Sequence, residues 1–164
     1  MNWATGVFDS AGHYTDEVYK FTKRFGVMRL FPGKGASEYG KPIATKPKKK
    51  NGHGVYLISI GTDNAKDLIS DRLCIKPAER GVPNPGFIHF PIKEWCELSF
   101  FEQLLAESKK PQKYKGGIRY VWDCPDGKRN EKIDCQVYGL TALRIAQQYF
   151  ALDLDILSAK IKPQ

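Results

Sequence analysis

The chain has 164 residues, of which 41% are hydrophobic and 12% aromatic, so it can bury the core of one globular domain and is not a disordered chain. Lys and Arg number 26 against 18 for Asp and Glu, and the net charge of +8 favours a polyanionic partner such as nucleic acid without requiring one. No apolar run approaches the roughly 18 residues of a membrane span. We therefore predict one domain over 1–164, with its core at about 4–150, a tail at 151–164 and no membrane partner.

Strand-like and helix-like patterns alternate along the chain. Short apolar runs predict strands, and apolar residues at helical spacing, such as Val18, Phe21 and Phe25, predict helices. Such alternation indicates an α/β layer fold. In chain order, we expect a strand at 3–8, a helix at 14–25, a strand at 27–31, a long loop at 32–54, a strand at 55–60, a helix at 64–73, a loop at 76–86, a short strand in GFIHF, a helix at 98–109, a strand at 117–122, a helix at 129–149 and a short helix in the tail.

Cysteine and histidine residues form no metal-binding box. The cysteines are widely spaced without a C-x-x-C pair, and the histidines form no H-x-x-x-H pair. We expect reduced, mostly buried thiols at Cys74, Cys96, Cys124 and Cys135.

One candidate acid, Asp9, follows the first strand and precedes the turn DSAG. In open α/β sheets, functional groups collect at the carboxyl ends of strands. The alternative is an ordinary turn or helix-start acid, since Asp is common at both.

A second acid, Asp134, lies beside the apolar stripe that includes Ile133 and Val137. Because burying a bare charge is costly, this carboxylate must be paired, hydrated or bound to a metal. The alternatives are a first-turn acid favoured by the helix dipole or a salt bridge to Arg129, and Glu131 lies three residues earlier on the same face.

Together the two acids suggest a site for hard cations. Mg²⁺ prefers oxygen ligands, and two such ions roughly 3.5–4 Å apart can activate a water and stabilise a leaving 3′ oxygen. Without metal the converging acids would repel each other, so the empty site should be loose.

The segment from Gly33 to Gly54 is rich in glycine, proline and lysine. Lysines on such an arm can neutralise phosphates in a sequence-independent, salt-sensitive way, although a solvated loop is an equal alternative. The segment PGKGAS lacks the spacing of a Walker A loop. The candidate phosphate-binding lysines are Lys34, Lys41, Lys46, Lys48, Lys49 and Lys50.

Six segments carry a family resemblance, in the order FDSAGHYTDEVYKF, KGASEYGKP, NGHGVYLISIGTDNAKDLI, GFIHFP, QLLAES and RNEKIDCQVYGLTALR. From about residue 4 to about 155, the chain resembles the nuclease domain of the large terminase subunit of lambda-type tailed phages. The resemblance implies an RNase H-like nuclease core, a mixed sheet flanked by helices, next to an N-terminal packaging ATPase. It further implies cutting of concatemeric double-stranded DNA with Mg²⁺ or Mn²⁺ at a two-ion site, in the host bacterial cytoplasm. The implied partners of the full-length protein are the small terminase subunit and the portal.

The resemblance also implies roles for particular residues. Asp9 and Asp134 match the second and third acids of the family, so both are expected to be catalytic and to bind metal. Lys34 matches the lysine of the KG element. Glu131 is expected to lie next to the metal ligands without binding the metal itself. Arg129 joins the lysines as a nucleic-acid contact. Asp63, with Asn64 beside it, is interpreted as a helix N-cap.

The family's first acid belongs to an earlier strand, which we expect before residue 1. The core would then lack its first strands, metal binding and cleavage would be weak, and the strand 3–8 would be an exposed sheet edge. We predict that another copy pairs with this edge or that another segment covers it.

Two other functions stay open. The chain could be a basic DNA-gripping or docking module without catalysis. A restriction-type nuclease using Asp63 and Lys66 is less favoured, because Asp63-x-x-Lys66 lacks the preceding acid on a paired strand.

Overall fold

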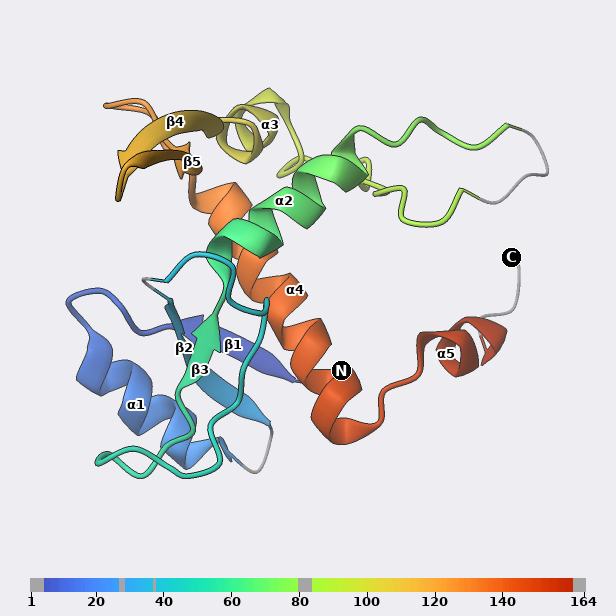
Figure 1. Ribbon diagram of the computed structural model, residues 1–164. Helices are drawn as coiled ribbons and strands as arrows, with labels where there is room; N and C mark the ends of the chain where they lie inside the picture. The colour runs from blue at the N-terminus through green and yellow to red at the C-terminus, as the bar shows by residue number, and fades with distance from the viewer. Residues whose placement is uncertain (1–4, 27–28, 37, 80–83, 161–164) are drawn as a thin grey trace.

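The computed structural model describes residues 5–26, 29–36, 38–79 and 84–160, and its elements confirm the α/β class (Figure 1). No helix in these ranges is both long and apolar enough to cross a bilayer. The elements are β1 (Gly6–Asp9), α1 (Thr15–Arg24), β2 (Leu30–Gly35), β3 (Ile58–Ile60), α2 (Thr62–Leu73), α3 (Leu98–Leu104), β4 (Ser108–Tyr114), β5 (Gly117–Asp123), α4 (Glu131–Phe150) and α5 (Leu154–Lys160).

The main sheet has three parallel strands in the order β1-β2-β3. Asp9 of β1 lies opposite Gly33 of β2, and Lys34 of β2 lies opposite Ser59 of β3. Since all three strands run the same way, their carboxyl ends meet at one edge, which we call the carboxyl edge. The opposite edge, where the strands begin, is the amino edge. β1 is a border strand of this sheet, as the sequence predicted.

Helices cover both faces of the sheet. Phe8 of β1 packs edge-to-face on Phe21 of α1, with ring centroids 5.2 Å apart. On the other face, Phe31 of β2 stacks on Phe150 at the end of α4, with centroids 6.2 Å apart. The core lies on this second face, where α4 packs against β1 and α2 crosses α4 (Figure 1). Its most deeply buried aliphatic side chains are Ile58, Ile60, Ala65, Val137 and Ile145.

Two glycines allow close approaches that shape the site. A Cβ at Gly33 would lie 3.3 Å from the Tyr138 ring and closer still to Val7 and Ile60, so the missing side chain lets α4 sit directly on the sheet. Gly61 donates its N–H to the carbonyl oxygen of Pro42 at 3.0 Å. These contacts bring both the last helix and the loop after β2 against the carboxyl edge.

The hairpin formed by β4 and β5 corrects the sequence prediction. A single helix was expected at 98–109, but α3 ends at Leu104 and an antiparallel pair follows. The turn at Lys115 and Gly116 has positive φ at both residues, 44° and 81°, as a type I′ hairpin turn requires. Strand β4 was missed because all of its residues are exposed, so no apolar alternation marks it.

Other differences are smaller. The expected mixed sheet is instead a parallel sheet and a separate antiparallel hairpin, with one antiparallel bridge between Thr45 and Ser59. The segment at 27–31 becomes a strand only from Leu30, and residues 27–28 lie outside the described ranges. The expected strand at 55–60 shortens to 58–60, and in GFIHF residues 86–90 form a turn and an irregular segment. The four thiols are free and exposed or half-buried, rather than mostly buried.

Candidate active site

A groove runs along β1 and the first half of α4 and contains both predicted acids. Residues 5–9 form one wall, and Glu131, Asp134, Cys135, Tyr138, Gly139 and Ala142 form the other. The volume of the groove is about 540 Å³. Asp9 enters from the carboxyl end of β1, and Asp134 enters from the first turns of α4. Two carboxylates that lie 125 positions apart in the chain therefore face one groove at the carboxyl edge.

The Asp9 carboxylate is held in place by two donors. The Tyr138 hydroxyl donates to Asp9 Oδ1 at 2.7 Å, and the Ala11 N–H donates to the same oxygen at 2.9 Å. Burial and the hydrogen bond to Asp9 raise the pKa of Tyr138, so its phenol stays a protonated donor at neutral pH. Among the described residues nothing donates to Oδ2, so this oxygen is available to a ligand.

Asp134 is linked to a buried charge cluster. Its Oδ1 lies 3.3 Å from Lys66 Nζ, but Lys66 donates more closely to both Glu107 oxygens, at 2.7 Å each. Asn130 Nδ2 donates to Glu107 Oε1 at 2.6 Å. The side chains of Lys66 and Glu107 are 11% and 4% exposed, whereas that of Asp134 is 45% exposed. Lys66 is therefore shared between Glu107 and Asp134, so Asp134 does not form an exclusive ion pair with it.

Glu131 and Arg129 form an exposed ion pair at the start of α4, with Arg129 Nε 3.0 Å from Glu131 Oε1. A hydrogen bond from its own backbone N–H and the bond from Arg129 lower the pKa of Glu131. The alternative in which Arg129 pairs with Asp134 is thus not what the structure shows. Glu131 lines the groove and remains next to the proposed metal ligands.

The predicted phosphate-binding lysines separate into two groups. Lys34 is exposed at the carboxyl edge, but strand alternation places it on the face shared by Phe8 and Pro32, opposite to Asp9. Lys41 lies in the loop that follows β2 and pairs with Glu38 at 2.5 Å. The remaining lysines belong to residues 46–50, whose Lys46 and Lys50 line a different groove at the amino edge; Lys48 and Lys49 are exposed between them.

The structure corrects one predicted helix cap and adds side chains to the site that the sequence patterns did not place there. The N-cap of α2 is Gly61, so Asp63 is a first-turn acid, while the Asn64 side chain donates to the Lys41 carbonyl oxygen at 2.8 Å. The added residues are Tyr138, Lys66 and Glu107, of which the sequence had suggested only Lys66, as a partner of Asp63 in a restriction-type site. Tyr138 lies beside the apolar stripe of the last helix, and Glu107 belongs to the family segment QLLAES. Neither pattern shows that Tyr138 contacts Asp9 or that Glu107 contacts Lys66.

The donor atoms of the groove fit a divalent cation. Carboxylate oxygens are the ligands that Mg²⁺ prefers, and this ion is commonly bound by one or two carboxylates together with waters and substrate phosphates. Asp9 Oδ2 and Asp134 Oδ2 accept no hydrogen bond from any described residue. In the described ranges no group of three or more His, Cys, Asp or Glu residues could hold a metal, so Asp9 and Asp134 do not belong to a complete cage, and Glu131 is paired with Arg129.

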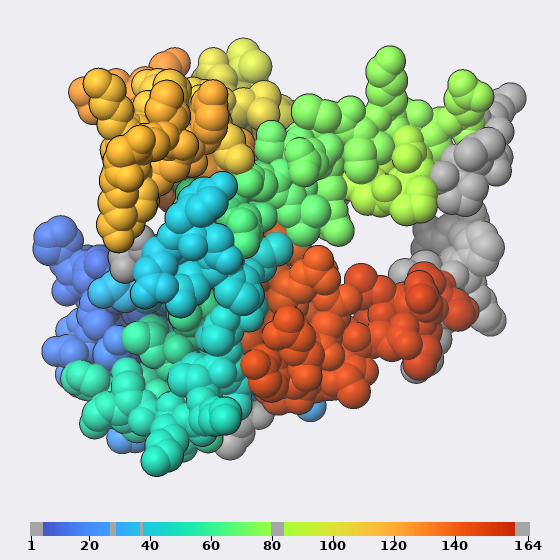
Figure 2. All heavy atoms as spheres, viewed as in Figure 1, coloured from blue at the N-terminus to red at the C-terminus, as the bar shows by residue number. Residues whose placement is uncertain are grey.

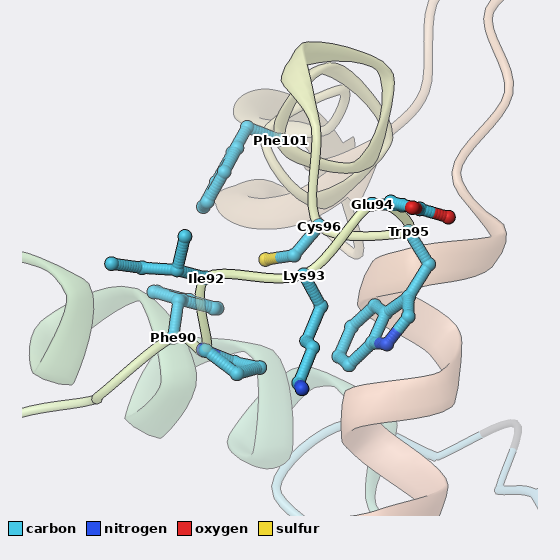
Figure 3. Close-up of a pocket in the computed structure, with 8 residues that line it drawn as sticks. Phe90, Ile92, Lys93, Glu94, Trp95, Cys96 and Phe101 are labelled. Carbon is cyan, nitrogen blue, oxygen red and sulfur yellow. The ribbon is translucent and has the colours of Figure 1, made fainter.

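A larger hollow elsewhere has a single carboxylate. It has a volume of about 700 Å³ and is lined by residues 90–96 and Phe101. Figure 3 shows Phe90, Ile92, Cys96 and Phe101 gathered around it, with Glu94 as its one carboxylate. Its aromatic walls belong to the packing of α3, since Phe90 contacts both Phe100 and Phe101 edge-to-face. We therefore place the candidate chemistry in the groove of Asp9 and Asp134.

The fold and this groove define a class: an α/β protein with a pair of acids at the carboxyl edge of a parallel sheet, in a strongly basic chain. Residues 1–153 match the family described as the endonuclease domain of the terminase large subunit gpA. The chain belongs to this family, which makes it a nuclease domain of a phage terminase large subunit.

Two relatives agree with the family. The chain is 41% identical over 163 residues to the terminase large subunit of Escherichia phage lambda and 40% identical over 152 residues to that of Enterobacteria phage P21. The alignments cover 99% and 92% of this chain and 24% of each relative, so the chain spans about a quarter of the length of the curated relatives it matches. No solved structure matches the chain.

Proposed function

We propose that the chain is a divalent-metal-dependent endonuclease unit that hydrolyses phosphodiesters of concatemeric double-stranded DNA for phage packaging. The observation that carries the proposal is the shared groove of Asp9 and Asp134. The family supports a nuclease of the packaging machinery, while the metal, the DNA form and an RNase H-like topology are part of the proposal. Its setting would be the host bacterial cytoplasm.

Each side chain of the groove has a definite task in this proposal. Asp9 and Asp134 would hold Mg²⁺ or Mn²⁺, with two ions in the complete site, and bound metal supplies activation of water and stabilisation of the leaving 3′ oxygen. Tyr138 keeps Asp9 oriented through its hydroxyl. Lys66 balances Glu107 and leaves the outer oxygen of Asp134 available. Lys34, Lys41 and Arg129 would contact phosphates nearby.

A chimaera tests catalysis in a complete protein. This chain would replace the matching quarter of the lambda large subunit, and nicking of supercoiled plasmid would be followed with Mg²⁺ or Mn²⁺. We expect cleavage that falls at least 100-fold in Asp9→Asn and in Asp134→Asn, because each loses a metal ligand. The matched control is Asp63→Asn, a first-turn acid of α2 outside the groove, which should cleave normally. Cleavage unchanged in Asp134→Asn would refute the nuclease assignment of this groove.

A second candidate is a basic DNA-docking module without catalysis. It is favoured by the lack of a three-acid cluster in the described ranges and by the exposed, lysine-rich strand β4. If the chimaera never cleaves but the chain shifts DNA at low salt, this candidate replaces the first.

Assembly is also proposed rather than shown. The small terminase subunit and the portal would be partners of the full-length protein, and the domain would comprise a core at about 4–150 and a tail at 151–164. The outer edge of β1 has no partner strand among the described residues, so self-association there stays a prediction. A concentration-independent monomer in sedimentation equilibrium would argue against it.

A further inference from the structure

A second groove lies at the amino edge of the sheet, away from the two acids. Its floor is apolar, from Leu30, Phe31, Pro32 and Val55, and its volume is about 650 Å³. Four cations line it: Lys23, Arg29, Lys46 and Lys50. Figure 2 shows the atoms of the 46–56 segment (teal) beside those of the last turns of α4 (orange).

Three of these cations, Arg29, Lys46 and Lys50, lie over aromatic rings. Lys46 Nζ lies 4.2 Å from the ring centroid of Tyr56 and 5.3 Å from that of Tyr149, and Lys50 Nζ lies 5.6 Å from Tyr56. The Arg29 guanidinium lies 4.4 Å from the Phe150 centroid. Within the described ranges none of the four cations lining the groove forms a salt bridge. The groove therefore carries positive charge that no acid compensates, on side chains that are already ordered.

The backbone of Arg29 has an unusual conformation. Its φ is 59°, a conformation that is uncommon for a residue with a side chain. Three hydrogen bonds hold it there: the Arg29 N–H donates to the Gly26 carbonyl oxygen, and the Arg29 carbonyl oxygen accepts from Gly6 N–H and from the Thr5 hydroxyl. Thr5 also lines the groove of the two acids, so this hydrogen bond joins a residue of one groove to a residue of the other.

Helix α4 gives the distance between the two grooves. Asp134 and Phe150 lie on this one helix, sixteen positions apart. At about 1.5 Å per residue, the separation along the helix is about 24 Å. A duplex rises about 3.4 Å per base pair, so this length corresponds to about seven base pairs.

We propose that the amino-edge groove is a second, sequence-independent site for DNA phosphates. A duplex whose cleaved phosphodiester lies at the acid pair would contact this groove about seven base pairs away. This inference rests on the proposed nuclease function, because it concerns the same substrate. Phosphates are favoured over stacked bases, since Tyr56, Tyr149 and Phe150 already carry a cation near their rings. The uncompensated charge favours a polyanion. A DNA duplex bound at the acid pair stays straight over the roughly 24 Å to this groove, which favours DNA over an acidic peptide.

The test measures binding, so it does not depend on cleavage. The chain would bind a fluorescent 24-base-pair duplex without metal at several salt concentrations. The groove variant is Lys46→Met/Lys50→Met/Arg29→Met, which keeps apolar stems against the rings but removes three charges. The slope of the logarithm of the binding constant against the logarithm of the salt concentration is negative. We expect its magnitude to decrease by about 2.7 in this variant, since each lost phosphate contact contributes about 0.9. The matched control is Lys20→Met/Lys76→Met/Lys93→Met, three exposed lysines outside the groove, with an expected change below about 0.5.

The outcomes separate the two proposals. Asp134→Asn should keep the wild-type salt slope of DNA binding. A variant that loses cleavage but keeps this slope therefore has an intact amino-edge groove. Equal slope changes in groove and control variants would overturn the groove proposal, as would an unchanged slope in a groove variant whose thermal unfolding is normal. Loss of polyglutamate binding with unchanged DNA binding would assign the groove to an acidic protein segment and also overturn it. If the triple variant unfolds, Lys50→Met alone should still lower the slope by about 0.9.

Discussion

The buried pair of Lys66 and Glu107 allows a quantitative prediction. In Glu107→Gln the near-isosteric amide removes the charge that Lys66 contacts through two bonds of 2.7 Å. Lys66 keeps only Asp134, at 3.3 Å, as a counter-charge. Removing one partner of a buried ion pair costs roughly 3–5 kcal/mol, because the other charge is left uncompensated. Since Asp134 compensates in part, we expect a loss of about 3 kcal/mol in the free energy of unfolding.

Urea denaturation followed by circular dichroism measures this loss. For a domain of this size, it corresponds to a fall of about 6–12 °C in the melting temperature. The double variant Lys66→Met/Glu107→Gln should recover part of the loss, because no buried charge remains unpaired. Glu131→Gln is the control: its pair with Arg129 is exposed, and we expect no measurable change. A loss below about 1 kcal/mol in Glu107→Gln, or no recovery in the double variant, would refute the uncompensated-charge argument.

Three further predictions concern positioning. Gly33→Ala should lower Mn²⁺ affinity in a calorimetric titration and destabilise the fold by about 1–3 kcal/mol, because the new methyl group overlaps Val7 and Ile60 and crowds the Tyr138 ring; unchanged affinity and stability would contradict this. The raised pKa of Tyr138 means that the folded state keeps a proton which the unfolded state releases above about pH 10, so stability should fall as the pH rises beyond that value, and less so in Tyr138→Phe; identical pH profiles of melting temperature would be the contrary result. Trp122→Phe removes the indole N–H that donates to Asp67 at 2.8 Å, which should loosen the hairpin and speed amide exchange in β4 and β5 without changing exchange in the parallel sheet; unchanged exchange in the hairpin would refute this anchoring role.

Local patterns were sufficient for the elements that bury an apolar stripe. The last helix was expected at 129–149 and spans 131–150, and α1 and α2 fall within two residues of their predicted bounds. Each of these helices repeats apolar residues at helical spacing, and that spacing is a property of neighbouring residues alone. The placement of Asp9 at the carboxyl end of a strand followed from the same kind of pattern.

Only the tertiary structure decided which charges meet. Lys66 of α2 and Glu107, in the segment between α3 and β4, lie 41 positions apart, and their pairing depends on how α2 packs against that segment. The lysine arm shows the same limit: composition predicted one phosphate-binding arm, but the fold sends Lys34 and Lys46 to opposite edges of the sheet. Hydrophobic periodicity reports which face of an element is buried, whereas contacts between charged side chains depend on how distant segments pack, and no local pattern encodes that.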